Sequence, residues 1–228
     1  MKFYYDLMSQ PSRALYIFFK LNPNIPVTFI PVALRKGEHL EDAFKAINRF
    51  QKVPCIIDDD GWKLSETVAI FRYLNDKYQI NEHWYPKDIR TRALVDEYME
   101  WQHNNTRMGC AMYFQVKWLI PMMSGNPPSE SRLNFAKTHM ENVLTLLENT
   151  WLESSEKSFL TTKEISFADI LAACELEQPK MADYDPFEGR PRLSSWYQKV
   201  KQFTNPFYDE AHALVNKIVN SNKNKPKL

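Results

Sequence analysis

The segment YYDLMSQPSRALYIFF, residues 4–19, begins with the aromatic composition of a buried strand and ends as an apolar helix. Ser9 stands at the change, and Pro11 follows in the expected first turn of the helix. Serine is a preferred N-cap, and proline is tolerated in the first turn because its missing N–H has no partner there. The same position offers spare N–H donors and the positive end of the helix dipole, so Ser9 could instead stabilise a bound thiolate.

The residues around this segment, up to Tyr78, alternate between strand-like and helix-like stretches. VTFIPV (27–32) predicts a second strand, and LEDAFKAI (40–47) predicts a short helix with Leu40, Phe44 and Ile47 on one face. PCIID (54–58) and WKLS (62–65) flank the turn pair Asp60-Gly61 and predict a hairpin, which the helix ETVAIFRYLNDKY (66–78) follows. The order β-α-β-α-β-β-α favours a small mixed sheet with helices on its faces.

The second half of the chain lacks strand patterns. QINEHWYPKD, residues 79–88, carries turn residues and predicts a linker. Asp88 is placed to cap a long helix that continues toward Trp118 and ends before Pro121, and Ser166 with Asp169 predicts a capping box at a later helix. We therefore expect an α/β domain over residues 1–78, a linker over 79–88 and an all-helical domain over 89–228.

The composition excludes several classes of protein. Among 228 residues, 29 are basic and 28 acidic, so no broad positive field for nucleic acid is expected. The three cysteines, Cys55, Cys110 and Cys174, lie far apart and predict neither disulfides nor a zinc site. The apolar runs are too short to cross a membrane, and the first residues do not resemble a signal peptide. These features favour a cytoplasmic protein.

Two further motifs each allow a structural and a functional interpretation. In KVPCII (52–57), Pro54 could simply begin a strand, or a cis Val53–Pro54 bond could expose the Val53 backbone to a peptide ligand. In LSETVAIF (64–71), the polar residues could cap the next helix. Alternatively, Thr67 and nearby N–H groups would suit a ligand carboxylate, and Glu66 would suit an ammonium group.

The order of these motifs along the chain resembles the N-terminal domain of cytosolic glutathione transferases, and the wider sequence is most similar to the theta class. The resemblance covers nearly the whole chain and is carried by DLMSQPSRALYIF (6–18), KGEHLEDAF (36–44), KVPCI (52–56), LSETVAIFRYL (64–74), WYPKD (84–88), VDEYMEWQH (95–103), ISFADI (165–170) and FEGRPRL (187–193).

The resemblance implies a thioredoxin-like N-terminal domain, an all-α C-terminal domain and a homodimer. It implies an enzyme of detoxification that joins the glutathione thiolate to small electrophiles, often hydrophobic or halogenated, with glutathione as co-substrate and without a metal. Ser9 would stabilise the thiolate, and Ser12 is the second candidate hydroxyl. Serine replaces the first cysteine of the C-x-x-C motif of redox relatives, which disfavours a thiol–disulfide reductase.

The same resemblance assigns the parts of glutathione to residues of this chain. His39 and Lys52 would bind the glycine carboxylate, and Val53, before Pro54, would pair with the cysteinyl backbone. Glu66 and Thr67 would hold the γ-glutamyl end. Without the resemblance, His39 and Lys52 would be interpreted as solvent-exposed polar residues.

Arg107 would reach the ligand region or a dimer partner, with a surface ion pair as the alternative. The electrophile pocket is expected between the domains, near Met112, Phe114 and Gln115. A non-catalytic binding or interaction module with the same fold is the alternative function.

Overall fold

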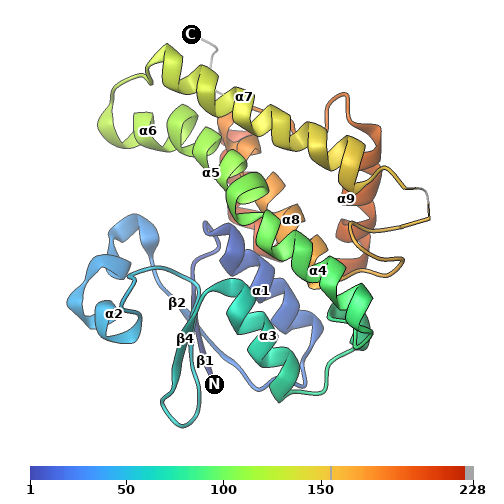
Figure 1. Cartoon of the computed structure of the whole chain (residues 1–228). Coiled ribbons are helices and arrows are strands. Elements are labelled where there is room, and N and C mark those ends of the chain that lie inside the picture. The colour runs from blue at the N-terminus through green and yellow to red at the C-terminus, as the bar shows by residue number, and fades with distance from the viewer. Residues whose placement is uncertain (155, 224–228) are drawn as a thin grey trace. The chain divides into compact units, whose positions relative to one another are not determined.

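The computed structural model describes residues 1–154 and 156–223, which form two compact units (Figure 1). Unit 1 comprises Met1–Asn81 together with Pro206–His212, and unit 2 comprises Glu82–Asn205 and the chain from Ala213 onward. Unit 1 therefore takes in one short segment of the last helix. The domain boundaries given above, at residues 78 and 88, remain proposals.

Unit 1 is built on a four-stranded mixed sheet with the strand order β2-β1-β3-β4. Strand β1 pairs in parallel with β2 and antiparallel with β3, which pairs antiparallel with β4. This is the parallel pair plus hairpin that the order of elements predicts. The elements are β1 Lys2–Tyr5, α1 Gln10–Leu21, β2 Thr28–Pro31, α2 Asp42–Ile47, β3 Cys55–Ile57, β4 Lys63–Ser65 and α3 Thr67–Lys77.

Alternate residues of β1 place apolar side chains on both faces of the sheet. The rings of Phe3 and Phe19, a residue of α1, lie 4.9 Å apart. The intervening Tyr4 turns to the other face, where its ring meets Phe44 of α2 edge-on at 6.3 Å. Because side chains alternate along a strand, this short segment joins helices to both sides of the sheet.

The helix predicted over residues 40–47 is shorter than expected, and the position of Leu40 was predicted wrongly. A 3₁₀ turn, Glu38–Leu40, precedes α2, and Glu41 between them has extended backbone angles. Leu40 is 63% exposed, whereas Phe44 is buried. The break at Glu41 removes Leu40 from the helical face that Phe44 occupies.

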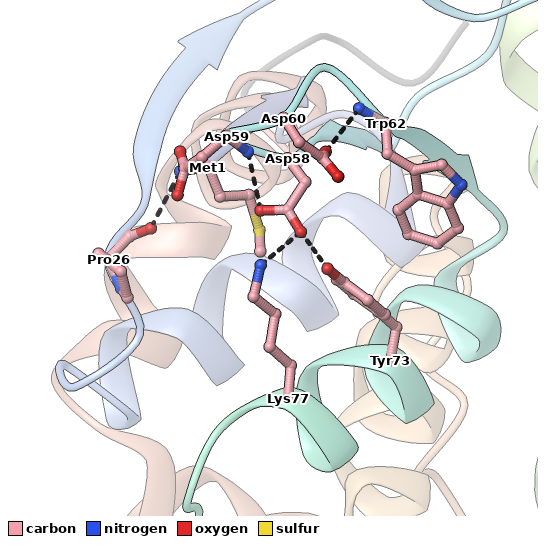
Figure 2. A network of polar contacts seen from close by, with 8 residues as sticks. All are labelled: Met1, Pro26, Asp58, Asp59, Asp60, Trp62, Tyr73 and Lys77. Carbon is pink, nitrogen blue, oxygen red and sulfur yellow. Dashed lines mark hydrogen bonds and ion pairs between the residues drawn. The ribbon is translucent and has the colours of Figure 1, made fainter.

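A charged network fixes the β3–β4 turn to α3. Figure 2 shows Asp58 between Lys77 and Tyr73, two residues of α3 that both bind its carboxylate. The Asp59 N–H donates to the same carboxylate at 2.9 Å, and the Asp59 side chain pairs with the Met1 ammonium group. Burial alone would raise the pKa of Asp58, but the bonds from Lys77, Tyr73 and the Asp59 N–H lower it to about 2. The network sets the orientation of α3 relative to the sheet.

Unit 2 is helical throughout its described part, and its centre is α8, Phe167–Leu176, in which every residue is buried. The predicted capping box is confirmed, because Ser166 and Asp169 exchange both hydrogen bonds. Asp88 accepts a hydrogen bond from the Thr91 N–H and begins α4, which confirms that cap as well. The other helices are α4 Ile89–Trp101, α5 Met108–Phe114, α6 Ile120–Ser124, α7 Glu130–Leu146, α9 Pro191–Thr204 and α10 Phe207–Lys223, whose later part belongs to this unit.

The long helix that Asp88 begins departs from the prediction in two ways. It is interrupted by π-helical segments at His103–Arg107 and Gln115–Leu119. It also does not end before Pro121, which lies in the first turn of α6. A π-helical stretch before a proline accommodates the missing N–H, since the regular i→i−4 pattern is already interrupted there. None of the described helices is both long and apolar enough to cross a membrane.

Candidate functional site

The loop between β1 and α1 is held by two charged side chains. Asp6 accepts a hydrogen bond from the Leu34 N–H at 2.9 Å, and its own carbonyl accepts one from the Ser9 N–H at 2.9 Å. Arg13, fully buried in α1, donates to the Leu7 carbonyl at 2.8 Å. Asp6 therefore ties this loop to the backbone of Leu34, and Arg13 ties it to α1, so the backbone of Ser9 is held at both ends of the loop.

Ser9 is the N-cap of α1, as its residue type predicts. Its half-buried hydroxyl accepts a hydrogen bond from the Ser12 N–H at 3.4 Å and donates one to the Val53 carbonyl at 3.4 Å. Hydrogen bonds between oxygen atoms are usually about 2.7–2.8 Å long, so the bond to Val53 is weak. Ser9 thus caps α1, and its hydroxyl can still give up the Val53 carbonyl for an acceptor that binds it more strongly.

The backbone of Val53 has the features that the peptide-binding interpretation of this motif requires. The Val53–Pro54 peptide bond is cis, as the second interpretation of this motif requires, and both residues are buried. In the described part of the chain, no group accepts a hydrogen bond from the Val53 N–H, and the carbonyl has Ser9 as its partner. Strand β3 begins two residues later, so an extended peptide could pair with Val53 as an added strand would.

The hairpin register brings a second motif to the same end of the sheet. Cys55 in β3 pairs with Ser65 in β4, so Val53–Pro54 and Glu66–Thr67 continue beyond the sheet on the same side. Thr67, which is buried, begins α3. The Ser9–Val53 hydrogen bond and the hairpin register therefore bring three parts of the chain that are remote in sequence to the same end of the sheet.

Glu66 precedes α3 in an unusual conformation. Its φ is 71°, a region that favours glycine, and the exposed side chain makes no capping hydrogen bond. The simple capping interpretation of this motif is therefore wrong for Glu66. The first N–H groups of α3 and the dipole of this eleven-residue helix favour a negatively charged group beside them.

The two residues predicted for the glycine carboxylate lie on adjoining loops of unit 1. His39 is half-buried in the 3₁₀ turn before α2, and Lys52 is exposed. Gln51, next to Lys52, donates a side-chain hydrogen bond to the Leu40 carbonyl at 2.8 Å, which joins the loops. The buried Nδ1 atom of His39 has no hydrogen-bond partner in the described chain.

Arg107 belongs to unit 2, whereas the other candidates belong to unit 1. It ends the π-helical segment His103–Arg107, and its Nη1 atom donates to the Glu175 carboxylate at 2.9 Å. Glu175 is completely buried, whereas the Arg107 side chain is 39% exposed. Arg107 thus forms an ion pair, but with a buried carboxylate and not at the surface as the alternative had it, and its role toward a ligand stays a prediction.

The residues expected near an electrophile divide between two environments. Met112 and Gln115 line a groove of about 390 Å³ in unit 2, beside Phe135 of α7. Phe114 is buried and stacks on Trp118, with ring centroids 5.3 Å apart. Phe114 therefore supports the helix and does not line this groove.

Comparisons with known proteins identify the chain. The family model for the "Glutathione S-transferase, N-terminal domain" matches residues 4–76, and that for the "Glutathione S-transferase, C-terminal domain" matches residues 110–202. Glutathione S-transferase theta-1 of Bos taurus is 41% identical over 100% of this chain and 94% of its own length. The human theta-1 protein is 42% identical over 94% of this chain and 88% of its own. The chain belongs to the theta class of the glutathione S-transferase family.

Solved structures agree with the fold of this glutathione transferase. The apo form of human glutathione-S-transferase T1-1 has a TM-score of 0.90 at 41% identity, covering 96% of this chain and 90% of that one. Human glutathione transferase theta-2, in complex with glutathione and an unknown ligand, has a TM-score of 0.89 at 37% identity, covering 99% and 92%. The thioredoxin-like domain with a mixed sheet and the all-helical domain, expected from the sequence, are confirmed.

The three cysteines of this transferase are buried and form no disulfide bond. Burial raises the pKa of Cys55, two residues from Val53, to about 12. Burial also raises the pKa of Cys110 well above its ordinary value, with a further contribution from Glu175. No group of three or more His, Cys, Asp or Glu residues in the described chain is arranged to hold a metal ion.

Sequence reasoning missed the residues that support the site of this transferase. Asp6, Arg13 and Asn48 bind backbone atoms on the loops that carry Ser9 and Lys52. An asparagine just after a predicted helix is a known turn signal, so Asn48 could have been identified. The contacts of Asp6 and Arg13 depend on how the loop folds back, which no local pattern predicts.

Proposed function

We propose that this transferase binds glutathione along the Val53 backbone and that the Ser9 hydroxyl keeps the glutathione sulfur ionised. The observation that carries the proposal is the hydrogen bond from Ser9 Oγ to the Val53 carbonyl, 3.4 Å long. A hydroxyl this close to the backbone of Val53 is within reach of a cysteine side chain whose own backbone pairs with that residue. The weak existing bond can be exchanged for a charge-assisted bond to sulfur.

The other candidate residues suit the remaining parts of the tripeptide. The N–H groups at the start of α3, with Thr67, suit the γ-glutamyl carboxylate, and the Glu66 carboxylate suits its ammonium group. His39 and Lys52 supply the donors for the glycine carboxylate. Arg107 would add a positive charge for an anionic part of glutathione or for the partner subunit of a homodimer.

The free energies involved are sufficient. Lowering a thiol pKa by two units requires a preference of about 2.7 kcal/mol for the anion. A hydrogen bond to a charged group contributes about 1.5–3 kcal/mol, and a helix N-terminus contributes about 0.3–1 kcal/mol. The Ser9 hydroxyl and the start of α1 together reach the required value.

The proposed reaction is a nucleophilic substitution or addition. The thiol proton leaves to solvent, and the thiolate sulfur forms a bond to an electrophilic carbon. In a substitution a halide leaves with the electron pair of the broken bond. In an addition the substrate keeps that pair and takes a proton from solvent. Ser9 donates its hydrogen bond throughout and forms no covalent bond. Small apolar or halogenated electrophiles remain the proposed substrate class, and the reduced, buried cysteines are consistent with a cytoplasmic enzyme.

The test is Ser9→Ala, with Ser12→Ala as the matched control. Loss of one charge-assisted hydrogen bond should raise the kinetic pKa of the conjugation reaction by roughly 1–2 units. Turnover near neutral pH should fall correspondingly, while glutathione affinity stays within a few fold. Ser12→Ala removes a buried hydroxyl that has no hydrogen-bond partner in the described chain, and its pH profile should match the parent enzyme. Identical profiles for Ser9→Ala and the parent would refute the assignment.

A further inference from the structure

Asn48 joins the end of α2 to the loop that presents Lys52 and Val53. Its backbone N–H bonds to the Phe44 carbonyl at 2.8 Å and so closes the helix. Its side-chain oxygen accepts from the Phe50 N–H at 3.1 Å, and its Nδ2 atom donates to the Lys52 carbonyl at 2.7 Å. Asn48 is 5% exposed, so both ends of its amide are used inside the loop.

The Lys52 carbonyl belongs to the same peptide unit as the Val53 N–H. That peptide bond is trans, so its carbonyl and N–H point in opposite directions in one plane. The bond from Asn48 therefore sets the direction of the Val53 N–H, which has no acceptor in the described residues. Rotation of this peptide would require breaking a short hydrogen bond.

The preceding residue shows why the loop needs such a restraint. Gln51 has a φ of 52°, a value that non-glycine residues seldom adopt. Its N–H bonds to the Asn48 carbonyl at 2.9 Å, and its side chain bonds to the Leu40 carbonyl at 2.8 Å. Asn48 thus holds the loop on both sides of a left-handed residue, and such residues gather at ligand-binding sites.

We propose that Asn48 is a positioning residue for substrate binding: it orients the Lys52–Val53 peptide so that the Val53 N–H meets the cysteinyl carbonyl of glutathione. The proposal rests on the proposed function, in which glutathione lies along Val53. It adds that the side-chain amide of Asn48, which does not itself touch glutathione, sets the affinity of Val53 for glutathione. Since Asn48 acts on the backbone and not on the sulfur, it affects binding and leaves thiol ionisation unchanged.

The test is Asn48→Asp, which keeps the acceptor for the Phe50 N–H and loses the donor to the Lys52 carbonyl. The matched control is Asn24→Asp, which removes a similar bond, from Asn24 Nδ2 to the Gln79 carbonyl at 2.8 Å, elsewhere in unit 1. We expect the dissociation constant of glutathione, measured by calorimetry, to rise roughly tenfold for Asn48→Asp, equivalent to about 1.4 kcal/mol. Asn24→Asp should bind as the parent enzyme does.

Three further measurements separate positioning from general damage. S-methylglutathione, which cannot ionise at sulfur, should lose affinity by the same factor. The kinetic pKa and the saturated turnover of Asn48→Asp should match those of the parent enzyme. If Asn48→Asp does not fold, Asn48→Ser is the second variant, because serine keeps a weaker form of the turn but cannot reach the Lys52 carbonyl.

Unchanged glutathione affinity in a folded Asn48 variant would overturn the proposal. So would a loss confined to glutathione and absent for S-methylglutathione, because the effect would then act through the sulfur. Failure of the proposed function is recognisable separately: the parent enzyme would not bind glutathione, or Lys52→Ala would bind it as tightly as the parent does.

Discussion

At the scale of single residues, Glu66 shows most clearly how the site departs from ordinary backbone rules. A non-glycine residue at a φ of 71° costs about 1–3 kcal/mol relative to a relaxed conformation. Its exposed carboxylate neither caps α3 nor packs in the core. We propose that this side chain contacts the ligand. The Ser-Glu-Thr motif predicts the residue type, but no local rule predicts a glutamate at positive φ.

Replacing Glu66 tests whether stability and binding are opposed at this position. Glu66→Gly should raise the free energy of unfolding by about 1 kcal/mol, because glycine adopts positive φ without strain. The same variant should weaken glutathione binding several fold, because the partner of the ammonium group is lost. Urea unfolding and calorimetry would measure the two effects.

The control for that experiment is Glu66→Gln, which keeps the side-chain length and the backbone strain but removes the charge. It should weaken binding without a gain in stability. A Glu66→Gly variant that binds glutathione as tightly as the parent would show that the carboxylate has no part in the site.

At the scale of elements, the sequence predicted those features that depend on neighbouring residues. The Asp60-Gly61 turn and the caps at Asp88 and Ser166 are local chemistry, and all three are present. The misplaced Leu40 and the helix that passes Pro121 depend on contacts that short patterns do not contain. The π-helical segments have no distinctive composition, so nothing in the sequence indicated them.

The network around Asp58 makes a pH-dependent prediction about the β3–β4 turn and α3. The pKa of Asp58 is lowered to about 2 in the folded protein, so its ionised form is favoured there. The stability that it contributes is fully present above about pH 4 and is lost as the pH falls through about 2. Asp58→Asn should therefore unfold more easily at pH 7, by about 1.5 kcal/mol. This difference should shrink between pH 4 and pH 3.

Asp60→Asn is the matched control for Asp58→Asn. Asp60 lies in the same turn and accepts a hydrogen bond from the Trp62 N–H at 2.9 Å (Figure 2), but it pairs with no lysine among the described residues. Urea unfolding at pH 7, 4 and 3 would compare the variants. A stability difference for Asp58→Asn that stays constant over this range would contradict the assigned role.

At the scale of the whole molecule, most motifs of the candidate site share one unit. The order of strands and the hairpin register place Ser9, Val53, Glu66 and Thr67 at one end of a sheet. That arrangement follows from topology, which the order of elements indicated. Arg107 is different, since its pairing with Glu175 joins segments 68 residues apart. No periodicity or spacing in the sequence indicates that contact.

We expect this transferase to be a homodimer in solution. Large apolar side chains remain exposed on the described helices α5–α7, among them Met108, Met123 and Phe135. Such exposed apolar groups are typical of protein interfaces. Sedimentation at micromolar concentration should therefore give twice the 27.0 kDa of one chain. A mass of one chain at that concentration would contradict the expectation.

The burial of Cys55 has a consequence for an enzyme exposed to oxidised glutathione. With its pKa raised to about 12 by burial, the Cys55 sulfur carries a negative charge in only about one molecule in a hundred thousand at pH 7. Attack on a disulfide requires that charge. Cys55, two residues from Val53 in the proposed tripeptide site, is thus protected from forming a mixed disulfide.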